Sequence, residues 1–338
     1  MRWLCQKVLF YVSFLSYARS MKGITISHSS AARFWSSITP YKLLPVKTNL
    51  QYAPYLSAAE LNRENLHPLS LQAFVKDSTL HILTPGKHRL VGINPRPFKQ
   101  MEAVISPHTH CSALPPNSIF KINEILFIVS PQLSFVQLCQ KKSLIKVIQL
   151  GFQLCGRYNG LRFNPHVSTA SIQSFIKSGK PLRGSKLARQ ALPYIRDNSA
   201  SPMETACTLL LCLPYKYGGY GIPFPELNKT IPLTYGTRKL TSHDFFIGDL
   251  VWQKERLVVE YNSDKFHIDK RSLYNDVQRS NLLDLNGIRT ITITRRMLFD
   301  VYEFEQTALL IGKTLNHRIK KPKGFYQKQI ELRRLLFN

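Results

Sequence analysis

The sequence predicts an α/β protein in two parts: a C-terminal unit with the element order α-β-β-α-β-α and a mixed sheet, and a smaller basic α+β module before it. Three observations predict this. The chain has 338 residues, enough for two domains. Helical and strand-like apolar patterns alternate cleanly only after residue 200. Residues 1–200 contain few Asp and Glu residues.

The charge is strongly positive and unevenly spread. Lys and Arg number 46 against 20 Asp and Glu, which gives a formal net charge of +26. Residues 1–200 carry 25 of the bases and six of the acids, so they contribute +19, and residues 201–338 contribute +7. A chain segment this poor in acid is typical of a protein that binds a polyanion, and DNA is the partner we expect. Charge that serves only solubility is the alternative.

The six cysteines give no sign of a metal site. They contain no C-x-x-C pair, and Cys207 and Cys212 lie in the apolar run ACTLLLCLP, which predicts small buried side chains. Reduced thiols in a cytoplasmic protein are the simpler expectation. We expect neither a membrane partner nor a small-molecule cofactor, and the oligomeric state stays open.

Residues 1–20 resemble a secretory signal, with Arg2 and Lys7 before an apolar run that ends near Tyr17. The run is short for a membrane span. The alternative is an over-extended start, with Met21 as the initiator, and this is the interpretation that we favour.

Residues 21–164 predict the basic α+β module. Short β-rich stretches such as TLHILT and MEAVISP are broken by Pro and Gly, and SPQLSFVQLCQ and SLIKVIQLGFQLCGRY have helical apolar spacing. This pattern fits a winged-helix-like module, but it does not determine which type of DNA-binding module the segment forms. Residues 165–198 predict a basic linker that lies along DNA phosphates or acts as a solvated hinge. Its candidate DNA-binding residues are Lys177, Lys180, Arg183, Lys186 and Arg189.

Residues 199–318 predict the C-terminal unit, and residues 319–338 a basic C-terminal helix. Ser201 followed by Pro202 and Glu204 is a typical helix start. The expected elements are a helix from Ser201, strands at 245–252 and 257–262, a helix at 269–286, a strand at 288–294, and a last helix that begins at Asp300.

Two carboxylates lie in segments whose sequence predicts strands. If residues 253–256 form a four-residue hairpin loop, Trp252 faces Leu257 and Asp249 faces Glu260. Opposed side chains in an antiparallel pair are about 5 Å apart, and like charges there are destabilising. A Mg²⁺ ion bound by the carboxylate oxygens of Asp249 and Glu260 resolves the conflict.

Two alternatives remain open. A slip of one residue in register separates the two acids. Lys254, Arg256 or Lys265 neutralises them as an ordinary surface ion pair.

The stretch 199–298 resembles the PD-(D/E)XK restriction-endonuclease-like superfamily, in its very-short-patch-repair-like branch. The matching text is SPMET, GDLVW, LVVEYNSDKFH and DVQRSNLLDLNGIRTITITRRML. Upstream, ISHSSAARFW and VSPQLSFVQL resemble AbiEi-type antitoxin-like proteins, which place a DNA-binding module before such a domain.

The resemblance implies a restriction-endonuclease-like core with Glu204, Asp249 and Glu260 as an acidic triad. It also implies a Lys two residues after the second-strand Glu, and this chain has Asn262 there. Lys265, His267 and Arg279 are the candidates to replace that Lys, and His267 suits general acid–base chemistry or a plain hydrogen bond.

Two residues have structural alternatives. Glu204 can serve as the third residue of a capping box, and this does not exclude metal binding. Arg279 stands three residues after Asp276 on one helix, so the two form a surface pair or border the cleft.

These observations predict a Mg²⁺-dependent endonuclease that hydrolyses DNA phosphodiesters. The alternative is a non-enzymatic, antitoxin-like or regulatory DNA-binding protein with a degenerate nuclease fold, and Asn262 favours it.

Overall fold

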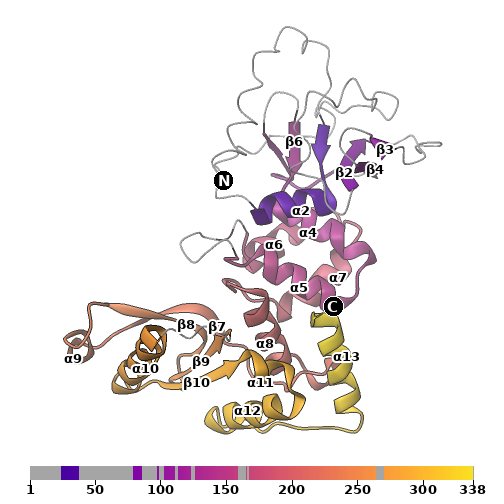
Figure 1. The fold of residues 1–338 in the computed structure, drawn as a ribbon. Coiled ribbons are helices and arrows are strands. Elements are labelled where there is room, and N and C mark those ends of the chain that lie inside the picture. Colours follow the sequence, from indigo (N-terminus) through magenta and orange to yellow (C-terminus); the bar gives the residue numbers. More distant parts are fainter. Residues whose placement is uncertain are drawn as a thin grey trace. The chain divides into compact units, whose positions relative to one another are not determined.

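The fold is given by a computed structural model, which describes residues 24–37, 79–85, 97–98, 103–110, 113–122, 126–158, 165, 167–263 and 270–337. The chain divides into two compact units (Figure 1). Unit 1 comprises Met1–Val147 and His166–Pro193, and unit 2 comprises Ile148–Pro165 and Tyr194–Asn338.

Unit 1 is built around a six-stranded mixed sheet in the order β3-β4-β2-β1-β6-β5. Parallel pairs (β1 with β6, β2 with β4) alternate with antiparallel ones. The sheet is larger than the small one that the sequence suggested. Its strands are β1 (Ile24–Ile26), β2 (Thr79–Pro85), β3 (Pro97–Phe98), β4 (Ala103–His110), β5 (Ile119–Lys121) and β6 (Leu126–Val129).

The helices of unit 1 follow from caps and apolar spacing. The Ser130 side chain accepts a hydrogen bond from the Leu133 amide and starts α4. On α5, the expected apolar residues Val147, Ile148 and Phe152 are buried. The elements are α2 (His28–Ser37), α4 (Pro131–Leu138), η6 (Cys139–Lys141), α5 (Leu144–Leu154, whose second half belongs to unit 2), α6 (Thr169–Lys177), α7 (Ser185–Ala191) and η7 (Leu192–Tyr194).

The segment 165–198, expected as a linker, is largely helical. Ser168 and Ser171 form a reciprocal capping box at the start of α6. Ile172, Phe175 and Ile176 are buried, at the spacing of one helix face. Helices α6 and α7 pack against α4, so this basic stretch is an integral part of unit 1 up to residue 193.

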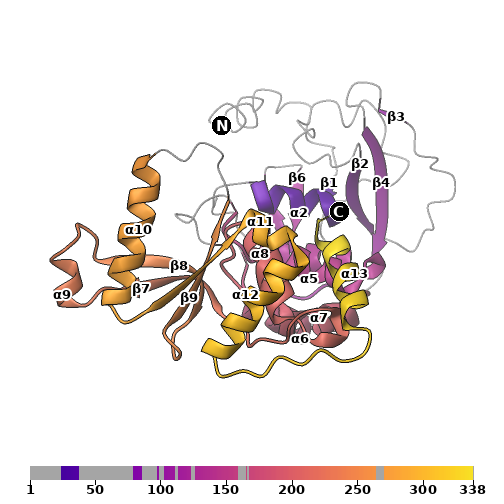
Figure 2. The same ribbon diagram turned by 60° about the horizontal axis from the view of Figure 1, so that its bottom comes forward.

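Unit 2 is an α/β unit around a four-stranded mixed sheet in the order β10-β9-β8-β7. Figure 2 shows α10 and α12 beside this sheet. The elements are α8 (Pro202–Cys212), η8 (Tyr215–Tyr217), β7 (Glu226–Pro232), α9 (Tyr235–Arg238), β8 (Phe245–Trp252), β9 (Leu257–Asn262), α10 (Lys270–Leu285), β10 (Arg289–Thr294), α11 (Arg295–Phe299), α12 (Val301–Thr314) and α13 (Phe325–Phe337).

The predicted α/β class with a mixed sheet is confirmed, and β8 and β9 have the expected bounds. Ser201 and Asp300 cap α8 and α12 as predicted. Strand β7 was not predicted, because ELNKTIP lacks an apolar alternation and ends in a proline. It pairs with β8 in antiparallel fashion and forms one edge of the sheet.

Cys207 and Cys212 are buried and free, as expected. Residues 1–20 lie outside the described part of the chain. None of the helices that the structure describes is long and apolar enough to span a membrane.

The core of unit 2 next to the sheet contains Ile231, Val251, Val258 and Leu283. Gly248 lies against this cluster. A Cβ at Gly248 would come within 2.8 Å of Val251 Cγ2 and 2.9 Å of Val258 Cγ1. No side chain therefore fits at this position unless the core moves.

We predict that Gly248→Ala lowers the free energy of unfolding of the full chain by about 1–3 kcal/mol, because the added methyl group overpacks the core. Urea denaturation measures it. Gly236→Ala is the matched control, since its Cβ would have nothing within 4 Å. An unchanged stability in Gly248→Ala would contradict the described packing.

Candidate acidic site on the four-stranded sheet

Four polar residues lie side by side across the sheet of unit 2. Leu227 pairs with Leu250 and Lys229 with Gly248, so Asn228 faces Asp249. Leu250 pairs with Val259, where the ladder between β8 and β9 ends, and Asp249 and Glu260 follow it, close enough for their charges to interact. Glu260 pairs with Thr292 on β10. We call Asn228, Asp249, Glu260 and Thr292 the polar row.

The predicted hairpin register is confirmed by the pair Trp252 and Leu257. Asp249 and Glu260 lie close enough for their charges to interact. Arg256 donates to the carbonyl oxygens of Asn286 and Gly287 instead of neutralising the acids.

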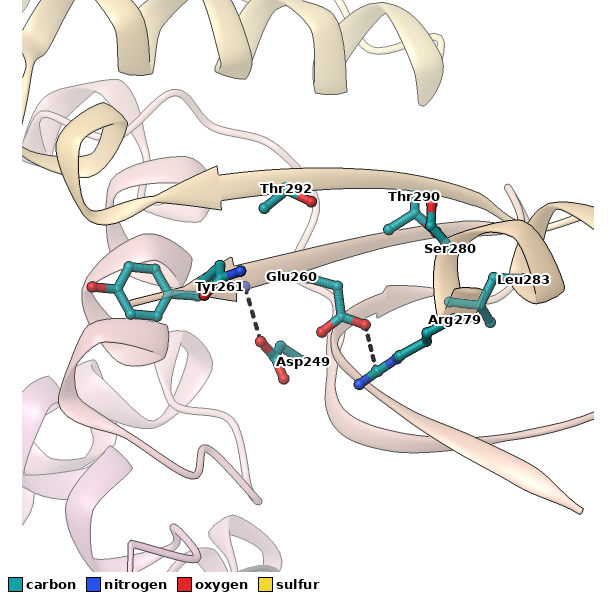
Figure 3. A pocket seen from close by; sticks show the side chains of 9 residues that line it. Asp249, Glu260, Tyr261, Arg279, Ser280, Leu283, Thr290 and Thr292 are labelled. Atoms are coloured by element: carbon teal, nitrogen blue, oxygen red, sulfur yellow. Dashed lines mark hydrogen bonds and ion pairs between the residues drawn. The ribbon is translucent and has the colours of Figure 1, made fainter. Parts of the chain in front are cut away.

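Strands β8 and β9 separate at the acid pair. Asp249 Oδ2 accepts a hydrogen bond of 2.9 Å from the Tyr261 amide. Arg279 on α10 donates to the Ile247 carbonyl of β8. It also donates, at 2.7 Å, to Glu260 Oε1 of β9 (Figure 3). Side chains thus satisfy backbone groups that the separated strands no longer pair.

The opening contains a cavity of about 270 Å³. It is lined by Asp249, Glu260, Tyr261, Asn262, Arg279, Ser280, Leu283, Thr290 and Thr292. Two buried polar atoms in its wall, Arg279 Nε and Thr290 Oγ1, have no hydrogen-bond partner among the described residues. A wall with two acids, a guanidinium group and unpaired polar atoms suits a polar or charged ligand.

The acid pair keeps a proton up to about pH 7. Burial, followed by the charge of Glu260, raises the pKa of Asp249 to about 7. Burial also raises the pKa of Glu260, and the nearby Arg279 opposes that rise.

Glu204 belongs to the same acidic cluster. It is 8% exposed, and burial, followed by the charge of Asp249, raises its pKa. Its Oε2 accepts hydrogen bonds from the Ala200 amide at 2.9 Å and from Asn228 Nδ2 at 2.7 Å. The residue therefore bonds to backbone at the helix start and also interacts electrostatically with the acid pair.

Asn228 positions Glu204. It has a positive φ of 46°, and its amide nitrogen donates to both Glu204 and the Asn198 carbonyl, the latter at 2.9 Å. A non-glycine residue held in the left-handed region is strained, and such residues cluster at functional sites. Sequence reasoning missed Asn228 because β7 itself was missed.

The structure brings Glu204, Asp249 and Glu260 together, and Asn262 lines the cavity. Arg279 borders the cavity, which is one of the two positions that the sequence analysis gave for it. Lys265 and His267 lie outside the described residues, as does the side chain of Asp276. The sequence analysis did not predict that Ser280, Thr290 and Thr292 line the cavity. The alternation in TITIT places the two threonines on one face of a strand, but it does not indicate a cavity there.

The predicted DNA-binding cations all lie in unit 1, on and around α6 and α7. Lys177, Lys180, Arg183, Lys186 and Arg189 are exposed. Arg183 and Lys186 also line a shallow hollow of about 390 Å³ with Gln140 and Gln190.

In the part of the chain that the structure describes, no three His, Cys, Asp or Glu side chains are placed to hold a metal ion by themselves. The acid pair alone offers two carboxylates.

No protein-family model, curated protein or solved structure matches the chain. The function is therefore argued from the chemistry of the site.

We predict that Asp249→Asn is more stable than the wild type above pH 7. The ordinary pKa of 3.8 rises to about 7 on folding, so the folded state keeps a proton that the unfolded chain releases between these values. The stability that this proton provides is complete below pH 3.8 and is lost as the pH rises through 7.

Urea denaturation between pH 5 and 8 should show the difference between Asp249→Asn and wild type widening with pH, to on the order of 1–4 kcal/mol. Asp284→Asn, at an exposed position on α10, is the control. A difference that does not change with pH would contradict the shared proton.

Proposed function

We propose that this protein is a Mg²⁺-dependent endonuclease that hydrolyses DNA phosphodiesters at the acid pair of unit 2. The observation that carries the proposal is the pair itself. Asp249 and Glu260 lie next to each other at a polar cavity where two strands separate, and burial together with the charge of Glu260 raises the pKa of Asp249. A structural pair has no need of such an arrangement, since burying two like charges is destabilising.

The residues fit a hard divalent cation. Mg²⁺ typically takes one or two carboxylates and completes its shell with water and substrate phosphate, so two acids suffice. The raised pKa values of Asp249 and Glu260 reflect a need for positive charge that a proton now meets. When bound, the ion would polarise the scissile phosphate and lower the pKa of an attacking water.

The chain's own groups would hold the substrate. Arg279 has an unpaired buried Nε, and Thr290 an unpaired Oγ1, at the cavity wall. The guanidinium group of Arg279, whose side chain is 36% exposed, suits phosphate oxygens, which accept charge-assisted hydrogen bonds from Arg. Because Arg279 also donates to Glu260, it opposes the rise in the pKa of that carboxyl group and holds it at the cavity. We propose that it takes the part of the Lys that Asn262 replaces.

The exposed cations of α6 and α7 would bind the DNA backbone. From residue 125 to residue 196 the sequence has no Asp or Glu, so no acid within this stretch offsets them. Such contacts give affinity without sequence preference.

A non-enzymatic DNA-binding regulator is the second candidate. One observation favours it: Arg279 already forms a 2.7 Å ion pair with Glu260, as an internal counterion in a site without chemistry would do. The resemblance to the restriction-endonuclease-like superfamily, with its antitoxin-like relatives, is compatible with both candidates.

We predict that the full-length protein binds Mg²⁺ or Mn²⁺ in calorimetry and nicks plasmid DNA only when the metal is present. Asp249→Asn and Glu260→Gln should each lower the cleavage rate by at least roughly 100-fold, because each removes a metal-binding carboxylate.

Glu226→Gln is the matched control, since Glu226 is an exposed acid that pairs with Lys229 on β7. It should cleave like the wild type. If all four proteins bind metal alike and none cleaves, the regulator becomes the better account.

We predict that replacing the five cations of α6 and α7 with Gln weakens DNA binding equally for unrelated sequences. The slope of log affinity against log salt should fall by about 0.9 for each phosphate that the protein no longer neutralises. Fluorescence anisotropy measures it, with Lys254→Gln plus Lys313→Gln as a control at exposed cations of unit 2. An unchanged slope would mean that the DNA binds elsewhere on the protein.

A further inference from the structure

The connection between β7 and β8 carries an unexplained apolar surface. Residues 233–245, which we call the tip, contain the short helix α9 and lie at the far end of the two strands, away from α8 (Figure 1). Tyr235 is 76% exposed, Leu240 64% and Phe245 50%. Large apolar side chains grouped at such exposure mark a surface that contacts a partner.

Hydrogen bonds hold the two ends of the tip. Asn286, a buried residue just after α10, accepts a 2.8 Å hydrogen bond from the Thr234 amide and donates to the Pro232 carbonyl. Thr234 caps α9, and Leu233 pairs through its amide with the Asp244 carbonyl. A side chain on a rigid support loses less freedom on binding than one on a flexible loop.

The surface combines aromatic and cationic groups. Lys239 Nζ lies 4.5 Å from the centre of the Tyr235 ring, and Arg238 is exposed beside it. Aromatic faces beside cations are the composition that binds unpaired nucleotides, because bases stack on the rings and phosphates pair with the cations. In an intact duplex the base faces are covered, so stacking requires unpaired bases.

The tip continues into the acidic site. Phe245 and Asp249 lie four residues apart on β8, which is roughly 13 Å of strand. DNA advances about 3.4 Å along its axis per nucleotide of one strand, so this span corresponds to about four nucleotides. Arg279 lies over the ring of the next residue, Phe246, at 5.6 Å, and so links the cavity to the base of the tip.

We propose that the tip binds unpaired nucleotides about four positions from the phosphate at the acid pair, so that the preferred substrate is DNA with a single-stranded segment beside the cleavage position. The substrate class rests on the nuclease proposed above; the binding preference does not require cleavage.

The test measures binding alone. Fluorescence anisotropy with the full-length protein in EDTA compares a fully paired duplex with the same duplex carrying one splayed, unpaired arm. The wild type should bind the splayed DNA roughly tenfold more tightly. Tyr235→Ala combined with Leu240→Ser should lose this preference while keeping the affinity for the duplex.

Tyr302→Ala is the matched control, because this tyrosine of α12 is 71% exposed and lies outside the tip. It should keep the preference. Equal binding of both DNAs by the wild type, or an equal loss of affinity for both DNAs in the tip variant, would overturn the proposal. Failure of the nuclease itself would show separately, as absent metal-dependent cleavage with the preference intact.

Discussion

The site depends on one constraint: two carboxylates placed side by side in a partly buried environment do not both ionise without a counter-charge. Burial and mutual repulsion together raise the pKa of Asp249 to about 7. The chain supplies one permanent cation, Arg279, to Glu260, and the raised pKa of Asp249 leaves a proton on the pair below about pH 7. A divalent cation would replace that proton, and the proposed chemistry follows from this exchange.

The surrounding structure serves to keep the acid pair in place. Separation of β8 from β9 frees a backbone amide and a carbonyl, and these are satisfied by Asp249 and Arg279 themselves. The same groups therefore stabilise the opening and form the cavity. Asn228, in a strained conformation, orients Glu204 towards the cluster. At Gly248, next to the acid pair, the core side chains pack so closely that no side chain fits.

Much of unit 2 could be predicted from the sequence because local signals were strong. Hairpin length alone set the register that brings Asp249 beside Glu260, and capping residues marked the starts of α8 and α12. Strand β7 was not predicted because its sequence has no apolar alternation, and for the same reason Asn228 was not predicted as a site residue. The ion pair between Arg279 and Glu260 depends on how α10 packs on the sheet, which spacing along the helix does not reveal.

In unit 1 the basic composition of residues 165–198 concealed a helix. The buried spacing of Ile172, Phe175 and Ile176 was present in the sequence, but the run of cations suggested a linker instead. Both features are real: one face of α6 packs in the unit while the charges remain exposed.

The most direct test counts protons. Calorimetry of Mg²⁺ binding in buffers of different ionisation enthalpy, about one pH unit below the raised pKa of Asp249, measures how many protons leave the protein when the ion binds. The account predicts a release that approaches one proton for the wild type, and none for Asp249→Asn. Metal binding without proton release in the wild type would show that the ion does not replace the proton shared by Asp249 and Glu260.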